Sequence, residues 1–334
     1  MARQRTRNVS NNDQNVLCYP QKGLPALPLE LLLLVVSHMK VPAIPRYGEC
    51  LTWNQERERR ESLRVLCQLC RSLRADLLPV LWERLEACTL RRPAHFMITP
   101  RAIAQILGQE VVGQLNLMIN LTLPYASYVR VVNVAIQPKF SPTALPKLAR
   151  AMTLMPNLHT VQIICKENMH KRSFEKCVYP SVRRASLPHQ ATSILSSFPE
   201  VVEVYINQSV WASEFRQFLQ AVALHCRKVE CFGWCSTYQN NYVSMDIVPQ
   251  TLPNLRRLEC QLKSHINGLV DPATFKNLEK FTLIVDGRLR DASANEFLAI
   301  NIRVARKALA GSSAPNKYLV VYNDQTRVES FDAL

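Results

Sequence analysis

The sequence predicts an α/β fold in which a small bundle of three helices precedes a solenoid with a parallel β-sheet. Apolar residues recur at helical spacing between Leu27 and Leu85. After Leu90, a short apolar pattern returns at intervals typical of repeat proteins. Segments with helical spacing separate its copies, and strands that alternate with helices form parallel sheets.

Composition and length indicate a folded chain with its own core. The 334 residues are enough for one large domain or for a small and a medium one, and 48% of them are hydrophobic. The longest apolar run, Leu31 to Val36, is far shorter than the roughly 20 residues that span a bilayer, so we expect no membrane segment.

The first residues favour a cytoplasmic or nuclear location. Met1 to Asn15 is polar and lacks the apolar centre of a secretory signal, so we expect the 11 cysteines to be reduced. Residues 1–22 contain few large apolar groups and are predicted to form a flexible basic tail. Arg3, Arg5 and Arg7 could serve as a nuclear signal, although a solvated terminus is the simpler interpretation.

The net charge of +15 is concentrated in the middle of the chain. Residues 1–90 hold 13 basic and 9 acidic groups, residues 91–200 hold 13 and 4, and residues 201–334 hold 15 and 13. A basic surface there could attract an acidic protein segment or the phosphates of a nucleic acid. No nucleic-acid motif accompanies the charge, so we favour a soluble protein with a high pI over a nucleic-acid binder.

Residues 23–90 are predicted to form the helical module. Pro28 suits the first turn of a helix, since its missing N–H would have no partner there. The next helix runs from Leu63 to Leu77, and a short third one follows Pro79 up to Leu85. An insertion at residues 40–61 separates the first two helices, and its charged end, 55–61, is expected to extend the second helix in solvent.

Residues 91–334 are predicted to form the solenoid. Six segments follow an apolar-x-x-apolar-x-apolar pattern, and they start 29, 43, 25, 29 and 23 residues apart. They are Val129/Val132/Val134, Leu158/Val161/Ile163, Val201/Val204/Ile206, Cys226/Val229/Cys231, Leu255/Leu258/Cys260 and Leu278/Phe281/Leu283. We expect helices over 214–222 and 293–309 and a last strand over 317–322. An ordinary α/β domain whose strands share a loose pattern is the alternative.

Three segments in this order resemble the F-box family. They are the Leu27-Pro28-x-Glu30-Leu31-Leu32 opening, the middle from Leu66 to Arg74, and the Pro79-x-Leu81-Trp82 close. The resemblance implies a module that docks on a Skp-family adaptor and, through it, on the cullin and RING subunits of a ubiquitin ligase. Degenerate leucine-rich repeats behind the box are similar to fungal members, in which they select the target protein. The long link at 40–61 departs from the family and puts the placement of the first helix on the adaptor in doubt.

The composition of the first helix agrees with this resemblance. The helix is apolar nearly all round, which is more than a three-helix bundle covers from one side. Either an external partner or the repeat domain itself must cover the remainder. The residues expected to form the adaptor-binding surface are Leu27, Pro28, Leu31, Leu32, Val35, Leu81 and Trp82, with Cys67 and Leu73 supporting it from inside.

A second binding surface is predicted in the long interval between the second and third repeats. Insertions in solenoids emerge on one face and often bind partners. The residues that could contact a partner are Lys171, Arg172, Phe174, Lys176, Tyr179, Arg183 and Arg184. A disordered basic loop explains the same composition.

Catalysis and metal binding are not expected. Cys67-x-x-Cys70 has zinc-knuckle spacing but lies on the apolar face of a predicted helix, and Cys226, Cys231 and Cys235 with His225 form only a loose cluster, as does His265 near Cys260. Phosphate loops, nucleophile elbows and metalloprotease motifs are missing. We therefore expect a non-catalytic subunit of a ubiquitin ligase with no cofactor and an unknown target. The alternatives are a repeat scaffold with a basic surface, and an F-box protein that works outside ubiquitination.

Overall fold

The computed structural model describes residues 23, 27–39, 55–87, 100–120, 125–165, 173–235, 247–262, 275–285, 292–323 and 326–332. These residues form a ten-stranded sheet with helices, which confirms the predicted α/β class and the parallel sheet. The expected tail, residues 1–22, lies outside the described residues.

The sheet is built in chain order. Each of the strands β2 to β9 pairs in parallel with the strand before it, and β10 turns back antiparallel to β9. The strands are β1 (Arg84–Ala87), β2 (Val131–Ile136), β3 (Thr160–Cys165), β4 (Arg184–Leu187), β5 (Glu203–Ser209), β6 (Cys231–Cys235), β7 (Arg257–Leu262), β8 (Lys280–Val285), β9 (Tyr318–Asn323) and β10 (Thr326–Asp332).

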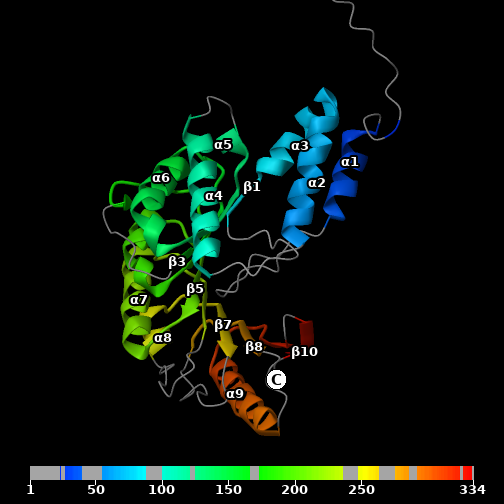
Figure 1. Ribbon diagram of the computed structural model, residues 1–334. Coiled ribbons are helices and arrows are strands. Elements are labelled where there is room, and N and C mark those ends of the chain that lie inside the picture. Colours follow the sequence, from blue (N-terminus) through cyan, green and yellow to red (C-terminus); the bar gives the residue numbers. More distant parts are fainter. Residues whose placement is uncertain are drawn as a thin grey trace, which may run out of the picture.

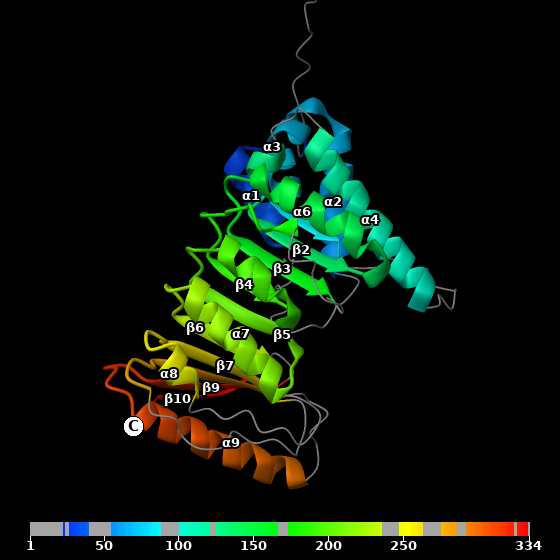
Figure 2. The same ribbon diagram turned by 90° about the vertical axis from the view of Figure 1, so that its left-hand side faces the viewer.

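Helices connect the strands and cover one face of the sheet. Figures 1 and 2 show α6, α7 and α8 side by side on that face and α9 at the end farthest from β1. The connecting elements are α4 (Pro100–Asn120), α5 (Tyr125–Tyr128), the 3₁₀ turn η2 (Pro138–Phe140), α6 (Ser141–Thr153), the 3₁₀ helix η4 (His189–Ser197), α7 (Ala212–His225), α8 (Ile247–Thr251) and α9 (Ala292–Ala310). The expected helices over 214–222 and 293–309 and the strand over 317–322 lie within α7, α9 and β9, apart from Lys317.

A continuous core lies between the sheet and these helices. Its central line consists of residues paired across neighbouring strands, each at most 1% exposed. This line is Leu85, Val132, Val161, Ala185, Val204, Phe232, Leu258, Phe281 and Leu319. Five of the six predicted repeat segments have their middle residue on it. Each repeat therefore buries its apolar face only together with its neighbours, as in a solenoid.

The fourth predicted segment is wrong by three residues. Val204 pairs with Phe232, so the repeat in β6 is Val229/Phe232/Trp234 rather than Cys226/Val229/Cys231. Both sets fit the same apolar pattern, and only strand pairing separates them. Cys231 lies on the opposite side of the strand, where its Sγ is 3.2 Å from the hydroxyl oxygen of Tyr205.

The sequence pattern also missed two repeats. Val182/Ala185/Leu187 forms β4 inside the interval expected to be an insertion, and it divides the spacing of 43 residues into two shorter ones. Trp82/Leu85/Ala87 forms β1, within the stretch assigned to the helical module. The solenoid therefore begins at Arg84, directly after the helices.

Three helices precede the sheet and pack on one another. They are α1 (Leu29–Ser37), α2 (Gln55–Leu69) and α3 (Arg71–Trp82), grouped beyond β1 in Figure 1. The prediction that residues 55–61 extend the second helix is confirmed, whereas residues 40–54 lie outside the described residues. The expected break at Pro79 is wrong. Cys70, at φ −156° and ψ 167°, separates α2 from α3, and the helix continues through Pro79.

A polar junction fixes the helical module to the solenoid. Only Glu83 separates α3 from β1, and its carbonyl oxygen accepts hydrogen bonds from the N–H groups of Arg130 and Val131 at 2.8 and 3.1 Å. Arg60 of α2 donates to the carbonyl oxygen of Glu86 at 3.1 Å and to the Glu110 carboxylate in α4 at 3.3 Å.

Two further contacts strengthen this junction. Gln114 holds both acceptors of Arg60 from within the solenoid, donating to the carbonyl oxygen of Glu86 and to the carboxylate of Glu110, at 2.9 and 3.0 Å. Trp82 stacks on Tyr125 with ring centroids 5.3 Å apart and planes 9° apart. The module and the solenoid are thus held in one relative orientation.

Truncation of Phe232 tests the corrected repeat register. Its side chain is fully buried between Phe215 and Trp234, so Phe232→Ala should lower the free energy of unfolding by about 3 to 5 kcal/mol. Urea denaturation measures this loss. Leu224→Ala, on the exposed side of α7, is the matched control and should change stability by less than about 0.5 kcal/mol. Equal losses in the two variants would contradict the register.

The junction should make stability depend on pH through Glu110. Burial is the main cause that raises the pKa of Glu110 above its ordinary value of 4.5, against the opposing effect of Arg60. The folded protein therefore binds this proton more tightly than the unfolded chain does, and the associated stability is present below pH 4.5 and lost as pH rises through the raised pKa. Wild type should lose stability relative to Glu110→Gln over that window.

Urea denaturation across this pH range measures the difference between the two proteins. Glu175→Gln, at an exposed position, controls for the loss of one carboxylate. A difference between wild type and Glu110→Gln that does not change with pH, or that changes in the opposite direction, would show that the ion pair with Arg60 outweighs the cost of burial.

Candidate functional site

The candidate site is the outer face of α1, which is apolar and open to solvent. Six large aliphatic side chains on or beside this helix are 38–54% exposed: Leu27, Leu29, Leu31, Leu33, Leu34 and Val35. We call these six residues the α1 face. Glu30 is the one charged residue of α1. So much exposed aliphatic surface on a nine-residue helix is typical of a binding site.

The sequence folds locally into a short helix with few stabilising devices of its own. The Leu32 N–H donates to the carbonyl oxygen of Pro28 at 3.0 Å, so Pro28 provides the first acceptor of the helix without needing a donor. At the other end, the Ser37 hydroxyl donates to the carbonyl oxygen of Leu34 at 2.7 Å.

Two side chains attach α1 to the rest of the module. Leu32 and Val36 are buried and contact the core formed by Leu63, Cys67, Leu73 and Leu77 of α2 and α3. Met39 packs against the same core from its edge. Since only one side of α1 is used in this way, the α1 face remains outside.

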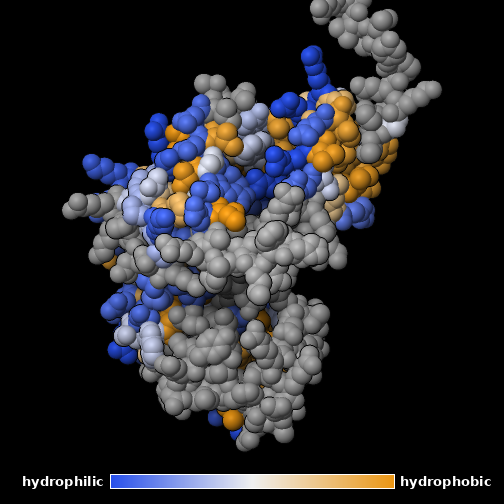
Figure 3. Space-filling view, in the orientation of Figure 1, coloured by the Kyte–Doolittle hydropathy of each residue, from blue (hydrophilic) through white to orange (hydrophobic). Residues whose placement is uncertain are grey.

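Figure 3 shows hydrophobic surface gathered where α1 lies in Figure 1. Burying a fully exposed leucine side chain contributes roughly 1.5 to 3 kcal/mol, and the half-exposed residues of the α1 face have part of that still to gain. A partner that covered them would gain several kcal/mol of binding free energy before the cost of association. The arrangement can bind an apolar groove but has no chemistry of its own.

The structure brings together four of the seven residues predicted to contact an adaptor. Leu27, Pro28, Leu31 and Val35 lie on or beside the exposed side of α1. Leu32 points inward, where Cys67 and Leu73 surround it as expected for supporting residues.

The remaining two predicted residues lie elsewhere. Leu81 is half-buried against the core of the helical module, and Trp82 packs on the solenoid core and on Tyr125. Trp82 is the first position of a repeat, which explains its place away from α1. Conversely, the adaptor-binding set omitted Leu29, Leu33 and Leu34, although the unbroken run of aliphatic residues around the helix was a signal for them.

The predicted partner-binding loop is corrected by the structure. Phe174 and Tyr179 are at most 3% exposed and belong to the solenoid core, and the Tyr179 hydroxyl donates to the carbonyl oxygen of Ala149 at 2.9 Å. They pack in the connection to β4, so they are not loop side chains available to a partner. Lys176 is exposed, and Lys171 and Arg172 lie outside the described residues.

The two arginines of that predicted surface lie at the start of β4. Arg183 pairs with Glu200 at 2.9 Å. Arg184 lies 3.7 Å from Glu203 and over the ring of Tyr205, 5.0 Å from its centroid. Both arginines therefore contact neighbouring repeats and are not side chains of a protruding loop.

Cys67 and Cys226 are buried among the apolar residues of the two cores. Burial raises the pKa of Cys67 and that of Cys226, the latter to about 12, which disfavours the thiolate needed to bind a metal or attack a substrate. Among the described residues, no group of three or more His, Cys, Asp or Glu side chains could share a metal ion. His265 lies outside them. None of the described helices has both the length and the apolar content to cross a bilayer.

Comparison with known proteins does not assign the chain to a family. No protein-family model matches it, and no curated protein resembles it significantly.

Proposed function

We propose that this chain is a non-enzymatic substrate-recognition subunit of a cullin-RING ubiquitin ligase of the SCF type. In this proposal α1, α2 and α3 form an F-box that binds a Skp-family adaptor through the α1 face. The solenoid then corresponds to degenerate leucine-rich repeats that bind a target protein. The cullin and RING subunits would join the complex through the adaptor, in the cytoplasm or nucleus.

The exposed α1 face is the observation that carries this proposal. In the described residues the solenoid does not cover it, because α1 contacts α2 and α3 through Leu32 and Val36 and the α1 face points away from them. This favours an external partner over the alternative in which the repeats bury the helix. The Leu-Pro-x-Glu-Leu-Leu opening that resembles an F-box is the segment that forms this face.

The junction between module and solenoid also supports a receptor role. A substrate receptor must hold its target at a fixed position relative to the ligase. Here, the Glu83 connection, the Arg60 hydrogen bonds and the Trp82–Tyr125 stack join the two parts through three separate contacts. A flexible linker would not provide this constraint.

A carboxylate on the α1 face should abolish adaptor binding. Leu34 is 54% exposed, so Leu34→Asp should fold normally but place an unpaired charge in the dry centre of the interface, weakening binding at least about 100-fold. Leu31→Asp combined with Pro28→Ala should act in the same way. Co-purification and calorimetric titration with a Skp-family adaptor measure the effect, and circular dichroism checks the fold.

Leu224→Asp is the matched control for this experiment. Leu224 is 66% exposed on α7, so the substitution makes the same chemical change at a similarly exposed leucine. It should leave adaptor binding unchanged. If wild type forms no complex with the adaptor, or if Leu34→Asp and Leu224→Asp bind it equally well, the proposed interface is incorrect.

A reconstituted ligase separates a substrate receptor from an F-box protein that works outside ubiquitination. Proteins captured by the chain should become ubiquitinated when adaptor, cullin, RING subunit and the upstream enzymes are added. Leu34→Asp should retain the captured proteins and lose their modification, because only the adaptor contact is broken. Capture without any modification, in a reaction where the adaptor complex forms, would favour the second role.

A further inference from the structure

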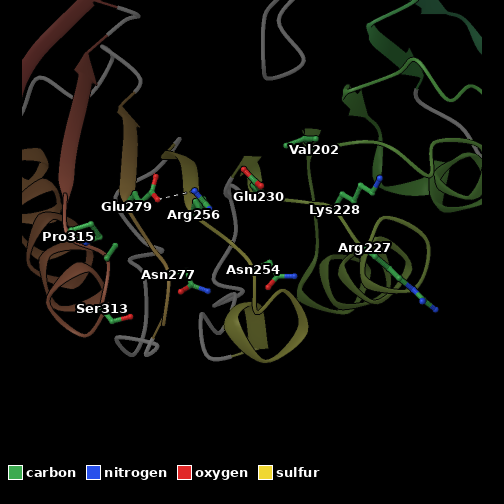
Figure 4. Close-up of a pocket in the computed structure, with 11 residues that line it drawn as sticks. Val202, Arg227, Lys228, Glu230, Asn254, Arg256, Asn277, Glu279, Ser313 and Pro315 are labelled. Carbon is green, nitrogen blue, oxygen red and sulfur yellow. Dashed lines mark hydrogen bonds and ion pairs between the residues drawn. The ribbon is translucent and has the colours of Figure 1, made fainter.

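A polar groove of about 570 Å³ lies at the edge of the sheet where the parallel strands begin. Figure 4 shows Arg227 and Lys228 at one end of it and Ser313 and Pro315 at the other. Its lining comes from the turns that precede β5, β6, β7, β8 and β9. The volume is within the range of sites that bind small ligands or short peptide segments.

The turns and first strand residues at this edge carry an excess of positive charge. We define the amino-edge strip as residues 180–184, 199–203, 227–231, 253–257 and 276–280, the corresponding five-residue segment of each repeat from β4 to β8. It contains eight cations, namely Arg183, Arg184, Arg227, Lys228, Arg256, Arg257, Lys276 and Lys280. It contains four carboxylates, namely Glu200, Glu203, Glu230 and Glu279.

Two of these carboxylates are each shared by two cations. Glu200 accepts from Arg183 and from Lys228, at 2.9 and 2.6 Å, and these hydrogen bonds hold its pKa below the usual range. Glu200 therefore stays ionised at neutral pH. One carboxylate between two cations leaves a unit of positive charge at this point of the strip.

The second shared carboxylate is on the face of the sheet opposite the apolar core line, because Glu203 precedes the core residue Val204. Glu203 accepts from Arg257 at 2.9 Å and lies 3.7 Å from Arg184. The side chains of Arg183, Lys228 and Arg257 are 42–58% exposed. Their remaining donors can therefore reach an incoming anion without breaking the existing contacts.

A protein segment with separate acidic residues fits this strip better than a nucleic acid does. The four carboxylates stand among the cations and would repel a continuous line of phosphates. The strip contains no aromatic residue on which a base could stack. Acidic side chains spaced along a peptide can instead meet the cation pairs and avoid the carboxylates.

We propose that the amino-edge strip, with its groove, binds an extended acidic segment of a target protein. This proposal rests on the proposed function in one respect, because the segment would belong to the protein that the ligase modifies. Arg227 and Lys228, whose side chains point outward from one end of the groove in Figure 4, bind its carboxylates there, and Arg184 and Arg257 bind them on the sheet face. The site differs from the α1 face in position and chemistry.

Fluorescence anisotropy of the full chain with short labelled peptides tests the proposal. The probes are an alternating Glu-Ser peptide, its Gln-Ser and Lys-Ser counterparts, and a single-stranded oligothymidylate. The Glu-Ser peptide should bind, more weakly at higher salt, and the other peptides should not. Replacing both Arg227 and Lys228 with alanine should weaken binding at least about fivefold.

Replacing both Arg216 and Lys139 with alanine provides the matched control. Both residues are exposed, on α7 and η2, and lie outside the amino-edge strip, so the change in net charge is the same. This control should bind the Glu-Ser peptide as wild type does. Equal weakening in both double variants, no binding of the Glu-Ser peptide, or oligothymidylate binding with the same dependence on Arg227 and Lys228 would overturn the proposal.

The result is independent of the test of the α1 face. Leu34→Asp should bind the Glu-Ser peptide like wild type. If wild type forms no adaptor complex but binds the Glu-Ser peptide, the proposed ligase role is contradicted and the acidic-segment site stands. An intact adaptor complex without peptide binding would contradict the acidic-segment site and leave the proposed ligase role standing.

Discussion

The pairing of each strand with the strand before it in the chain is the constraint on which the rest of this structure depends. A parallel strand offers one apolar face that it cannot bury alone, so Val161, Val204 or Phe281 becomes core only beside its neighbours on either side. The same pairing aligns the turns that precede the strands. It therefore assembles the amino-edge strip from residues far apart in sequence, and it fixes where the helical module meets the first strand.

The solenoid and the helical module differ in how completely they bury their apolar side chains. In the solenoid, helices cover the apolar line of the sheet almost completely. In the helical module, α1 buries only Leu32 and Val36 against α2 and α3, and six aliphatic residues on or beside α1 remain exposed. A nine-residue helix has little stability in isolation, so α1 has a physical reason to need a partner. This imbalance, rather than any polar feature, distinguishes α1 from the other described helices.

Sequence patterns predicted the elements whose apolar spacing was unambiguous. The first helix, α7, α9 and five repeat segments have long aliphatic or aromatic periodicities. The break at Cys70 was not predictable, because Leu69 and Arg71 on either side are both good helix formers. β4 was missed because its central core residue is the small Ala185. In β6, two overlapping sets fit one pattern, and long-range pairing chose between them.

The candidate site was predictable in the same uneven way. Leu31 and Val35 were identified because an excess of aliphatic residues is visible in the sequence itself. Trp82 was assigned to a surface through the resemblance to the F-box, and Phe174 and Tyr179 because aromatic residues among cations are common at interfaces. Here the repeats bury Phe174 and Tyr179 and hold Trp82 against their core.

The single residue between α3 and β1 also has a mechanical consequence. Neighbouring strands lie about 4.8 Å apart, so the solenoid reaches about 40 Å from Glu83 to β9, and a tilt of about 10° there would move its far end by about 7 Å. Substitutions around Glu83 would thus change the orientation of the solenoid relative to the helical module. Both binding surfaces would stay intact, but a bound protein would move toward or away from whatever acts on it.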